Sequence, residues 1–445
     1  MWTEPLYGAD EMRRAEAGQD VSELMRRAGA GVAAEALRRF PEARSFVAVC
    51  GGGANGGDGR IAVDRLRAEG RDAQAVDVAA GTLPPADVLV DALFGTGFSG
   101  GPRREAKRAI DAINASGAPV VAVDLPSGVD ASTGEVAGVA VEADVTVTFH
   151  GWKVGLAVAP GRHHAGEVVV ADIGLAPAET EHRLVTPRVL SLVPRRRASD
   201  NKYSAGSVLV VGGAPGLTGA VCLAAEAAFR ADAGYVAVAV PAPSLPVVEA
   251  RLLEAVKGDI VDVFDLVERA SALALGPGLG RTPERRELVR RLLAATGLPA
   301  VVDADGLDGL EPVERDAPTV LTPHAGELGR LLDEGSDWVS AHRLAAARRC
   351  ARMFDAVCVL KGADTIVAGP DGRVLVCAHG PPGLATAGTG DVLTGVTAAF
   401  LAKGMPALEA AAAAATACGV AASLAPQQAG LVASDVISLL PRALA

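Results

Sequence analysis

The sequence predicts two consecutive α/β domains, each built around a mostly parallel sheet. Three observations predict this arrangement. The chain has 445 residues, more than one typical domain holds. Short apolar runs alternate with helical stretches in both halves, which is the pattern of βαβ units. Many of these runs end in glycine-rich or polar loops, and open α/β sheets bind ligands at that edge.

Composition narrows the class of protein. Half of the residues are hydrophobic, 21% are charged, and 52 are glycine, which indicates a globular α/β enzyme and not a disordered chain. The net charge of −11 argues against a general nucleic-acid or anionic-membrane surface, where a basic excess is needed. We expect small-molecule substrates, a homo-oligomer, and neither nucleic acid nor membrane as partners.

No segment predicts export or membrane insertion. The amino terminus mixes charges and lacks an apolar run. The alanine-rich stretch that starts at Ala407 is too weakly apolar for a membrane span and predicts a buried helix. Scattered cysteines without metal-binding spacing predict reduced core thiols and a cytoplasmic protein, although pairing of two of them stays open; they are Cys50, Cys222, Cys350, Cys358, Cys377 and Cys418.

The first half begins with an amphipathic helix over residues 20–40. Between 45 and 174, the apolar runs SFVAVC, DVLVDALF, PVVAVDL, ADVTVTF and EVVVADIG predict strands, and the stretches between them predict helices. Periodicity fades near 177–201, where prolines and charges gather. We therefore predict a first domain over 1–185, a linker over 186–200 and a second domain over 201–445.

Three loops of the first half contain residues that could bind a ligand or take part in catalysis. The segment CGGGANGGDGR at 50–60 joins a strand to a helix, so its amides predict an anion cradle. Two further strands end in DALFGTGFSGG at 91–101 and VDLPSGVD at 123–130. Asn55, Asp91 and Ser127 offer hard oxygen ligands for an alkali or alkaline-earth cation, and Asp124 is left for proton transfer. Taken singly, each residue is equally consistent with a cap or a tight turn.

These motifs resemble the NAD(P)H-hydrate epimerase family over residues 1 to about 180. The resemblance implies a Rossmann-like three-layer domain, a K⁺ site at Asn55, Asp91 and Ser127, and substrate contact at Asp124. One departure is Ala54, where the family usually has a first asparagine. The implied substrate-binding residues are Ala54, Asn55, Gly56, Gly57, Asp58, Gly95, Thr96, Gly97, Phe98, Ser99, Gly100, Gly101 and Asp124.

The second half carries six motifs in which an apolar run meets glycine or polar residues: NKYSAGSVLVVGGAPGLTGA, ALALGPGLG, VVDADGL, LTPHAGE, VLKGADT and ATAGTGDVLTGV. The last, ATAGTGDVLTGV at 385–396, combines a phosphate-binding type of loop with a carboxylate, Asp391. Lys361 stands at a strand end, where an ammonium suits a phosphate, although a solvated lysine is the plain alternative. His324 is equally consistent with a helix cap. Asp303 and Asp305 are consistent with turn formation after a strand.

In their order, these motifs resemble the ADP-dependent NAD(P)H-hydrate dehydratases of the ribokinase-like superfamily. Because the two families occur fused in this order, the chain resembles bifunctional NAD(P)H-hydrate repair enzymes. The resemblance places Ala220, Gly278, His324 and Asp391 at the hydrate. It places the nucleotide at Lys361, Gly362, Ala363, Asp364, Thr365, Gly388, Thr389 and Gly390.

The resemblance also answers how one loop holds both a phosphate and Asp391. In ribokinase-like enzymes the aspartate faces the substrate hydroxyl while the preceding amides face the transferred phosphoryl group. We expect Asp391 to be the general base, ADP the phosphoryl donor and Mg²⁺ its companion. The residues do not decide between ADP and ATP. Two alternatives stay open: a small-molecule kinase fused to a non-catalytic domain, and a scaffold role for the first domain.

Overall fold

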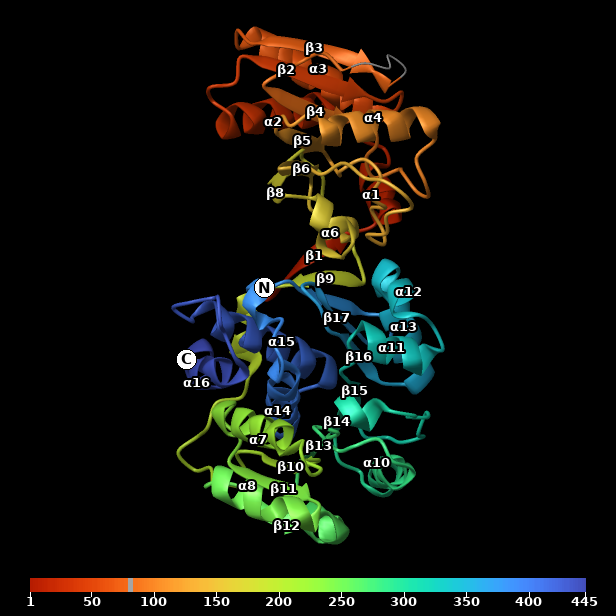
Figure 1. Ribbon diagram of the computed structural model, residues 1–445. Coiled ribbons are helices and arrows are strands. Elements are labelled where there is room, and N and C mark those ends of the chain that lie inside the picture. Colours follow the sequence, from red (N-terminus) through yellow and green to blue (C-terminus); the bar gives the residue numbers. More distant parts are fainter. Residues whose placement is uncertain (79–82) are drawn as a thin grey trace. The chain divides into compact units, whose positions relative to one another are not determined.

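The computed structural model describes residues 1–78 and 83–445, which form two compact units (Figure 1). Unit 2 comprises Pro5–Arg183, and unit 1 comprises Met1–Glu4 and Leu184–Ala445. The divisions fall inside strand β1 (Thr3–Tyr7) and strand β9 (His182–Val185). Among the described residues, no helix combines the length and the apolar character that a membrane span requires.

Unit 2 is built on a six-stranded parallel sheet in the order β3-β2-β4-β5-β6-β8. Five of these strands fall on the predicted apolar runs, whereas the edge strand at Asp72–Asp77 was not predicted. The strands are β2 (Ser45–Cys50), β3 (Asp72–Asp77), β4 (Val88–Ala92), β5 (Val120–Val123), β6 (Val145–Phe149) and β8 (Glu167–Ala171). A separate short strand, β7 (Trp152–Lys153), pairs in parallel with β1.

Helices cover both faces of this sheet and make three layers. Alternate side chains of a strand point to opposite faces. Phe46 and Ala48 of β2 therefore pack with α2 (Val21–Arg39) and α3 (Ala54–Ala68), whereas Val47 and Val49 pack with α4 (Arg104–Ala115). The remaining helices of the unit are α1 (Ala9–Glu16), α5 (Val154–Ala157) and α6 (Gly161–His164).

Unit 1 contains the strand order β12-β11-β10-β13-β14-β15-β16-β17-β18, parallel up to β16 and antiparallel from β16 to β18. The strands are β10 (Ser207–Val211), β11 (Tyr235–Val240), β12 (Val256–Asp259), β13 (Ala272–Leu275), β14 (Ala300–Val302), β15 (Thr319–Leu321), β16 (Val357–Leu360), β17 (Thr365–Ala368) and β18 (Val374–Cys377).

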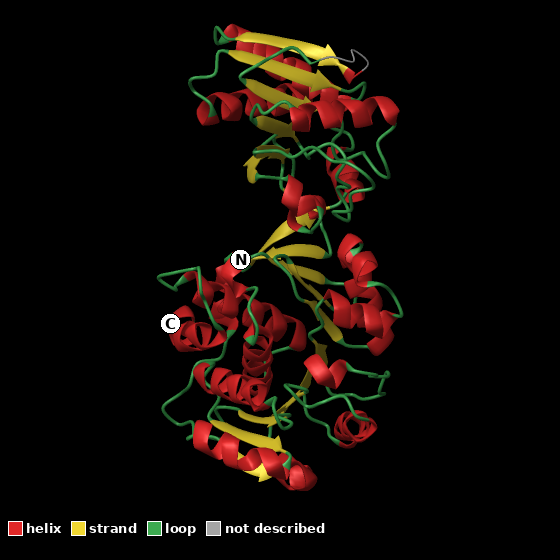
Figure 2. Cartoon of the chain, in the orientation of Figure 1, coloured by secondary structure: helices red, strands yellow, loops and turns green. Residues whose placement is uncertain are grey.

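Helices lie on both sides of this sheet as well, as Figures 1 and 2 show. One side carries α7 (Thr218–Arg230), α14 (Thr389–Ala402), α15 (Ala407–Ser423) and α16 (Ala433–Ala443). The other carries α10 (Pro283–Ala295), α11 (Ala325–Leu332) and α13 (Arg343–Phe354). Shorter helices are α8 (Leu245–Arg251), α9 (Val263–Val267) and α12 (Ser336–Ala341).

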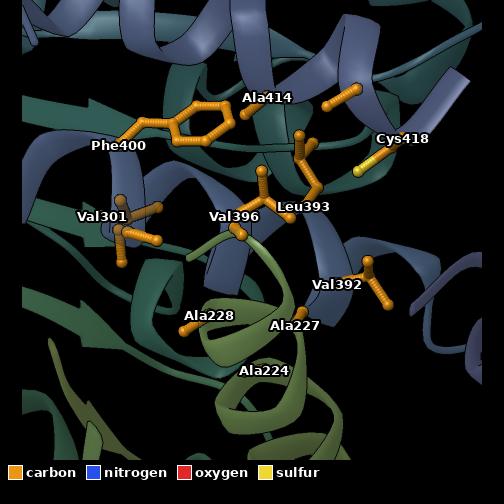
Figure 3. Packing of buried hydrophobic residues seen from close by; sticks show 14 of the residues in the cluster. Ala224, Ala227, Ala228, Val301, Val392, Leu393, Val396, Phe400, Ala414 and Cys418 are labelled. Atoms are coloured by element: carbon orange, nitrogen blue, oxygen red, sulfur yellow. The ribbon is translucent and has the colours of Figure 1, made fainter. Parts of the chain in front are cut away.

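Small residues let α7 and α14 pack very closely (Figure 3). A Cβ atom on Gly395 of α14 would lie 2.1 Å from the carbonyl oxygen of Ala224 on α7, so only glycine fits there. Val396 and Phe400 of α14 and Ala414 of α15 fill the same core. The alanine-rich stretch is thus a buried helix, as predicted, and all six cysteines are buried and free of disulfide bonds.

Part of the segment predicted as a linker, residues 186–200, is packed against unit 1. Residues Pro187–Leu192 form a 3₁₀ helix, and Val189 and Leu190 are buried in the core of unit 1. The amide of Thr186 donates a hydrogen bond of 2.9 Å to the carbonyl of Trp2, which ties the first residues to unit 1. Prolines and charges around this short helix weaken the periodicity of the segment, but Val189 and Leu190 still pack.

Candidate active sites

The glycine-rich turn of unit 2 delivers α3 to the carboxyl edge of the sheet. Strand β2 ends at Cys50, and α3 begins at Ala54. A Cβ atom on Gly56 would lie 1.9 Å from the carbonyl oxygen of Gly51, so the turn closes only with glycine at position 56. Asn55 and Asp58 are consequently buried at the start of the helix, with 8% and 7% of their surface exposed.

A cavity of about 750 Å³ opens at this edge of unit 2. Ten of the predicted substrate-binding residues line it: Ala54, Asn55, Asp58, Gly95, Thr96, Gly97, Phe98, Ser99, Gly101 and Asp124. Gly56, Gly57 and Gly100 belong to the same two loops without lining the cavity. Glu16 and Phe149 also line the cavity. The three predicted loops therefore converge on one cavity.

Asp124 is the most constrained carboxylate of the cavity. It follows β5 with a left-handed backbone (φ 67°), which a non-glycine residue adopts at a cost. One carboxylate oxygen lies 2.8 Å from the ammonium of Lys153 and accepts a hydrogen bond from the Thr148 hydroxyl at 3.2 Å. The other accepts from both the amide, at 2.9 Å, and the hydroxyl of Thr96. Four donors thus surround Asp124.

These donors decide the charge of Asp124. Burial by itself raises the pKa of this carboxyl, but the nearby charge of Lys153 and the hydrogen bonds from Lys153 and Thr96 outweigh burial and hold the pKa below its ordinary value. Asp124 is therefore a fixed anion with its oxygens occupied. This geometry suits stabilisation of a positive charge in the cavity better than the proton transfer expected from the sequence.

Asp58 has the opposite environment. Burial, together with the negative charges of Asp124 and Glu16, raises the pKa of Asp58 to about 8. Its Oδ1 atom is buried and has no hydrogen-bond partner among the described residues. At neutral pH, Asp124 is consequently ionised and Asp58 protonated on the wall of the same cavity.

The three residues predicted to bind K⁺ lie at the ends of neighbouring elements. The two oxygens of Asp91 accept hydrogen bonds from the amide and the hydroxyl of Ser127, at 2.8 and 2.7 Å. A Cβ atom on Gly95 would lie 2.8 Å from Oδ1 of Asn55 and 3.1 Å from Oδ2 of Asp124, so Asn55 reaches the same loop. The carboxylate of Asp91 is fully buried, and burial raises its pKa to about 6.

Asp91 takes part in no ion pair with the residues at 1–78 and 83–445. A buried carboxylate without a cationic partner, hydrogen-bonded to the hydroxyl of Ser127, is a group whose charge a monovalent alkali cation can neutralise. The donor chemistry is therefore compatible with the K⁺ that the resemblance implies.

Sequence reasoning missed Lys153 and Glu16. Lys153 is completely buried, and its ammonium also donates to the carbonyl of Phe149 at 2.7 Å. The sequence did contain a signal for Lys153, because a lysine in the apolar stretch GWKVGLAVA needs a buried anion as its partner. Glu16 had no such signal, since it ends a helix far away in the sequence.

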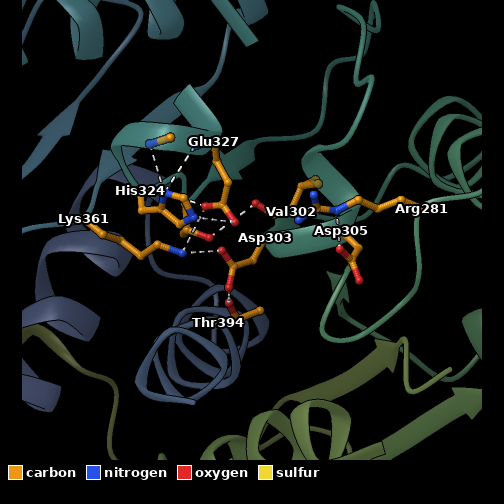
Figure 4. A network of polar contacts seen from close by, with 10 residues as sticks. Arg281, Val302, Asp303, Asp305, His324, Glu327, Lys361 and Thr394 are labelled. Atoms are coloured by element: carbon orange, nitrogen blue, oxygen red, sulfur yellow. Dashed lines mark hydrogen bonds and ion pairs between the residues drawn. The ribbon is translucent and has the colours of Figure 1, made fainter. Parts of the chain in front are cut away.

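The site of unit 1 centres on Asp303, which follows β14 (Figure 4). One of its oxygens accepts a hydrogen bond of 2.7 Å from the ammonium of Lys361, which follows β16. The other accepts one of 2.8 Å from the hydroxyl of Thr394 on α14. Glu327 lies 3.6 Å from the same ammonium. Asp303 thus organises three elements, a role that its interpretation as a turn former did not include.

Asp391 lies in the first turn of α14, directly after the glycine-threonine loop. Gly388 precedes the helix with a left-handed backbone (φ 90°), as a glycine readily does. Burial and the charge of Asp303 raise the pKa of Asp391 to about 7, and Lys361 opposes this rise. A carboxyl group with a pKa near neutrality is suited to general-base catalysis. The free amides of the helix start suit a phosphate.

His324 is a helix cap in the structure. Its Nδ1 atom accepts hydrogen bonds from the amides of Gly326 and Glu327, at 3.0 and 3.3 Å, at the start of α11. Glu327 completes a capping box through the amide of His324. The imidazole side chain remains 56% exposed, and its Nε2 atom lies 3.4 Å from a carboxylate oxygen of Glu327, so a ligand can reach the exposed part of the ring. Capping and substrate contact are thus compatible.

The other predicted residues of unit 1 lie in three places. Ala220 and Gly278 come together, since a Cβ atom on Gly278 would lie 3.2 Å from that of Ala220. Within the KGADT segment, Asp364 is buried and paired with Arg343 at 3.0 Å, and the Thr365 hydroxyl donates to the carbonyl of Gly362. Side chains of this segment therefore shape the loop. Asp305 accepts hydrogen bonds from Gly280 and Arg281, at 2.9 and 2.7 Å.

Two family models match the chain. Residues 208–442 match a family described as NAD(P)H-hydrate dehydratase. Residues 21–82 and 71–155 match a family described as YjeF-related protein N-terminus. The first match covers more than half of the chain and lies within unit 1.

Curated relatives match nearly end to end. Bifunctional NAD(P)H-hydrate repair enzymes of Moorella thermoacetica and Pyrobaculum aerophilum are each 38% identical and cover 94% of this chain and 91% and 93% of their own lengths. The Escherichia coli enzyme of that name is 34% identical over 98% of this chain and 93% of its own.

Solved structures match one half of the chain. The ADP/ATP-dependent NAD(P)H-hydrate dehydratase of Bacillus subtilis, co-crystallised with ATP and Mg²⁺, aligns with a TM-score of 0.54 and 28% identity, covering 59% of this chain and 96% of that one. A ribokinase-like superfamily protein of Enterococcus faecalis aligns with a TM-score of 0.54 and 25% identity, over 60% of this chain and 97% of its own. The expected ribokinase-like fold is confirmed.

Proposed function

Because the chain belongs to the family of bifunctional NAD(P)H-hydrate repair enzymes, we propose that each of its two units catalyses one step of cofactor repair. Unit 2 epimerises the R and S forms of the NAD(P)H hydrates. Unit 1 dehydrates the S form to NAD(P)H at the expense of ADP, which leaves as AMP and phosphate. The observation that carries the proposal is the match over 94% of the chain, with a polar site in each unit.

In unit 1, we assign the general base to Asp391. Its carboxylate takes the proton of the C6 hydroxyl, and that oxygen then attacks the β-phosphoryl group of ADP. The C6–O bond breaks with phosphate as the leaving group, and a proton leaves C5 to give the dihydronicotinamide ring. Phosphate is a far better leaving group than hydroxide, which is the reason for the nucleotide. His324, Ala220 and Gly278 are proposed to contact the hydrate.

The nucleotide is proposed to bind between two loops of unit 1. The residues are Lys361, Gly362, Ala363, Asp364 and Thr365 after β16, and Gly388, Thr389 and Gly390 at the start of α14. Amides at a helix start and one ammonium are suitable partners of a diphosphate. Mg²⁺ is proposed to accompany the nucleotide, as in the Bacillus subtilis structure. Homo-oligomeric assembly and a cytoplasmic location stay predictions.

In unit 2, the cavity is proposed to hold the hydrated nicotinamide. The ring nitrogen expels the C6 hydroxyl to give a planar iminium ion, and water returns to either face. The fixed carboxylate of Asp124 stabilises this cation at close range. Asn55, Asp91 and Ser127 are proposed to hold K⁺, which neutralises the buried charge of Asp91 and orders the loops around the substrate.

Recovery of absorbance at 340 nm from a mixture of R and S NADPH hydrates tests the proposal. We expect complete recovery with ADP, beyond the S fraction and faster than spontaneous epimerisation permits. Recovery that halts once the S form is consumed would contradict the epimerase assignment. No recovery with ADP or ATP would contradict the dehydratase assignment and favour a small-molecule kinase.

A further inference from the structure

Asp58 lines the cavity of unit 2 and keeps one buried carboxyl oxygen without a hydrogen-bond partner among the described residues. This oxygen is Oδ1. The residue lies in the second turn of α3 and is only 7% exposed. A buried carboxyl group without a partner is costly to the fold, so its retention next to a substrate cavity calls for a chemical role.

Asp124, on the same cavity, is the less suitable proton carrier. The ammonium of Lys153, the hydroxyl of Thr148 and two donors of Thr96 already occupy its oxygens. To accept a proton, Asp124 would have to break its ion pair with a lysine that is itself completely buried.

We propose that Asp58, and not Asp124, transfers the proton during epimerisation, while Asp124 stays ionised and stabilises the cationic intermediate. This inference rests on the epimerase function proposed for unit 2. It assigns a general acid and base to a residue for which the sequence predicted substrate binding alone.

The charges around Asp58 support this division of roles. Burial and the negative charges of Asp124 and Glu16 raise the pKa of Asp58 to about 8, so the group is protonated at neutral pH. Lys153, which is buried behind the cavity, is engaged by Asp124, while Arg103 and Glu105 also line the cavity. Two carboxyl groups whose environments drive their pKa values apart are a recurrent arrangement of acid and fixed anion in enzymes.

The proton balance closes with this one group. The acid form of Asp58 donates its proton to the C6 hydroxyl, the C6–O bond breaks, and water and the iminium ion form. The resulting carboxylate of Asp58 then removes a proton from the water molecule that adds to C6. Addition to the original face restores the starting epimer. Rotation of the planar ion about its bond to the ribose presents the other face and gives the other epimer.

The substitution Asp58→Asn tests the inference in the full-length enzyme, because asparagine keeps the size and polarity but transfers no proton. Purified R-NADPH hydrate is incubated without nucleotide, so that the dehydratase is idle, and the epimers are separated by chromatography. We expect kcat for epimerisation to fall by at least about 10²-fold with little change in KM. Asp64→Asn, an exposed carboxylate of the same helix, is the matched control and is expected to behave as wild type.

Two further readouts separate a catalytic from a structural role. The first readout is the rate at which Asp58→Asn dehydrates the S hydrate with ADP. We expect this rate to equal that of wild type, which would show that the chain is folded. In the wild type, kcat is expected to fall as pH rises through about 8, because the acid form of Asp58 is required; Asp58→Asn is expected to lose this pH dependence, and Asp58→Glu to recover part of the rate.

Three results would overturn the inference. These are epimerisation by Asp58→Asn within threefold of wild type, a rise in KM with unchanged kcat, and persistence of the pH dependence in the variant. Each of them leaves the epimerase function intact. Absence of epimerisation in the wild-type enzyme would instead overturn the proposed function together with this inference.

Discussion

The ammonium nitrogen of Lys361 lies 2.7 Å from a carboxylate oxygen of Asp303, although 58 residues separate them in the sequence. Because Asp303 also accepts a hydrogen bond from Thr394, this pair joins the ends of β14 and β16 to the helix that carries Asp391. The pKa of Asp391 is raised first by burial, and the two members of this ion pair shift it further in opposite directions.

Asp303→Asn should move the pH dependence of dehydration. The negative charge of Asp303 raises the pKa of Asp391, whereas Lys361 lowers it. Removing that charge therefore lowers the pKa of Asp391. In a plot of kcat/KM against pH, the rise that accompanies ionisation of Asp391 is then expected at a pH about one unit lower than in wild type. Asp371→Asn, which breaks an exposed pair with Arg373, is the control. A pH profile of Asp303→Asn that is identical to that of wild type would contradict this coupling.

Asp391→Asn should inactivate the dehydratase without unfolding it. Loss of a general base lowers turnover by about 10²- to 10⁴-fold, whereas nucleotide binding depends on the amides and Lys361. We expect kcat for the S hydrate to fall in that range and the KM for ADP to stay within a few-fold of wild type. Turnover close to that of wild type would show that another group takes the hydroxyl proton.

The same residue should make stability depend on pH. The folded-state pKa of Asp391 is raised to about 7, above its ordinary value of 3.8, so the folded protein keeps a proton that the unfolded chain releases. Stability is therefore lost as pH rises between these values, by up to about 1.4 kcal/mol per unit. Unfolding by urea at pH 5 and pH 7 should show a smaller loss in Asp391→Asn than in wild type. Equal losses would contradict the raised pKa.

Lys153→Met should destabilise unit 2 strongly. The substitution leaves the carboxylate of Asp124 buried without its cation, which costs about 3 to 5 kcal/mol. Adding Asp124→Asn removes that charge, so the double variant should regain much of the lost stability. Calorimetry of both variants measures the difference. A double variant no more stable than Lys153→Met would show that packing, and not charge, is lost.

Ala54→Asn should improve the epimerase site. Ala54 lines the cavity and is exposed at the start of α3, where the resemblance implies a substrate-contacting asparagine. One added hydrogen bond is worth about 0.5 to 1.5 kcal/mol, so we expect the KM of the R hydrate to fall by about 2- to 10-fold. The KM of the S hydrate for dehydration serves as the internal control and should not change. An unchanged or higher KM for epimerisation would show that Ala54 costs this enzyme no contact.

The regular parts of the fold were predictable from sequence for a physical reason. Buried parallel strands read as short apolar runs, so β2, β4, β5 and β6 fall where the runs stand. The hairpin of β17 and β18 was not predicted, although the turn residues Pro370, Asp371 and Gly372 stand between its two apolar runs. The packed 3₁₀ helix at Pro187–Leu192 was missed because prolines and charges hid two core residues.

Site residues could be predicted where a loop follows a strand. They could not be predicted where the interacting residues are far apart in the sequence. The convergence of Asn55, Thr96 and Asp124 on one cavity follows from their places at neighbouring strand ends. The donors that surround Asp124 did not follow, since Lys153 comes from a later two-residue strand. The raised pKa of Asp58 depends on burial and on Glu16, and no sequence pattern reports either of them.

The most direct test of the central claim, that one chain holds two independent active sites, is complementation between single-site variants. Asp391→Asn and Asp124→Asn are each incubated with R and S NADPH hydrates and ADP, alone and then mixed, and absorbance at 340 nm is followed. Asp391→Asn alone should form NADPH at least about 10²-fold more slowly than wild type. Asp124→Asn alone should consume the S form and then proceed only at the rate of spontaneous epimerisation. The mixture should recover all of the NADPH at a rate close to that of wild type. A mixture that slows at the S fraction, or either variant alone recovering all of the NADPH at the wild-type rate, would contradict the presence of two independent sites.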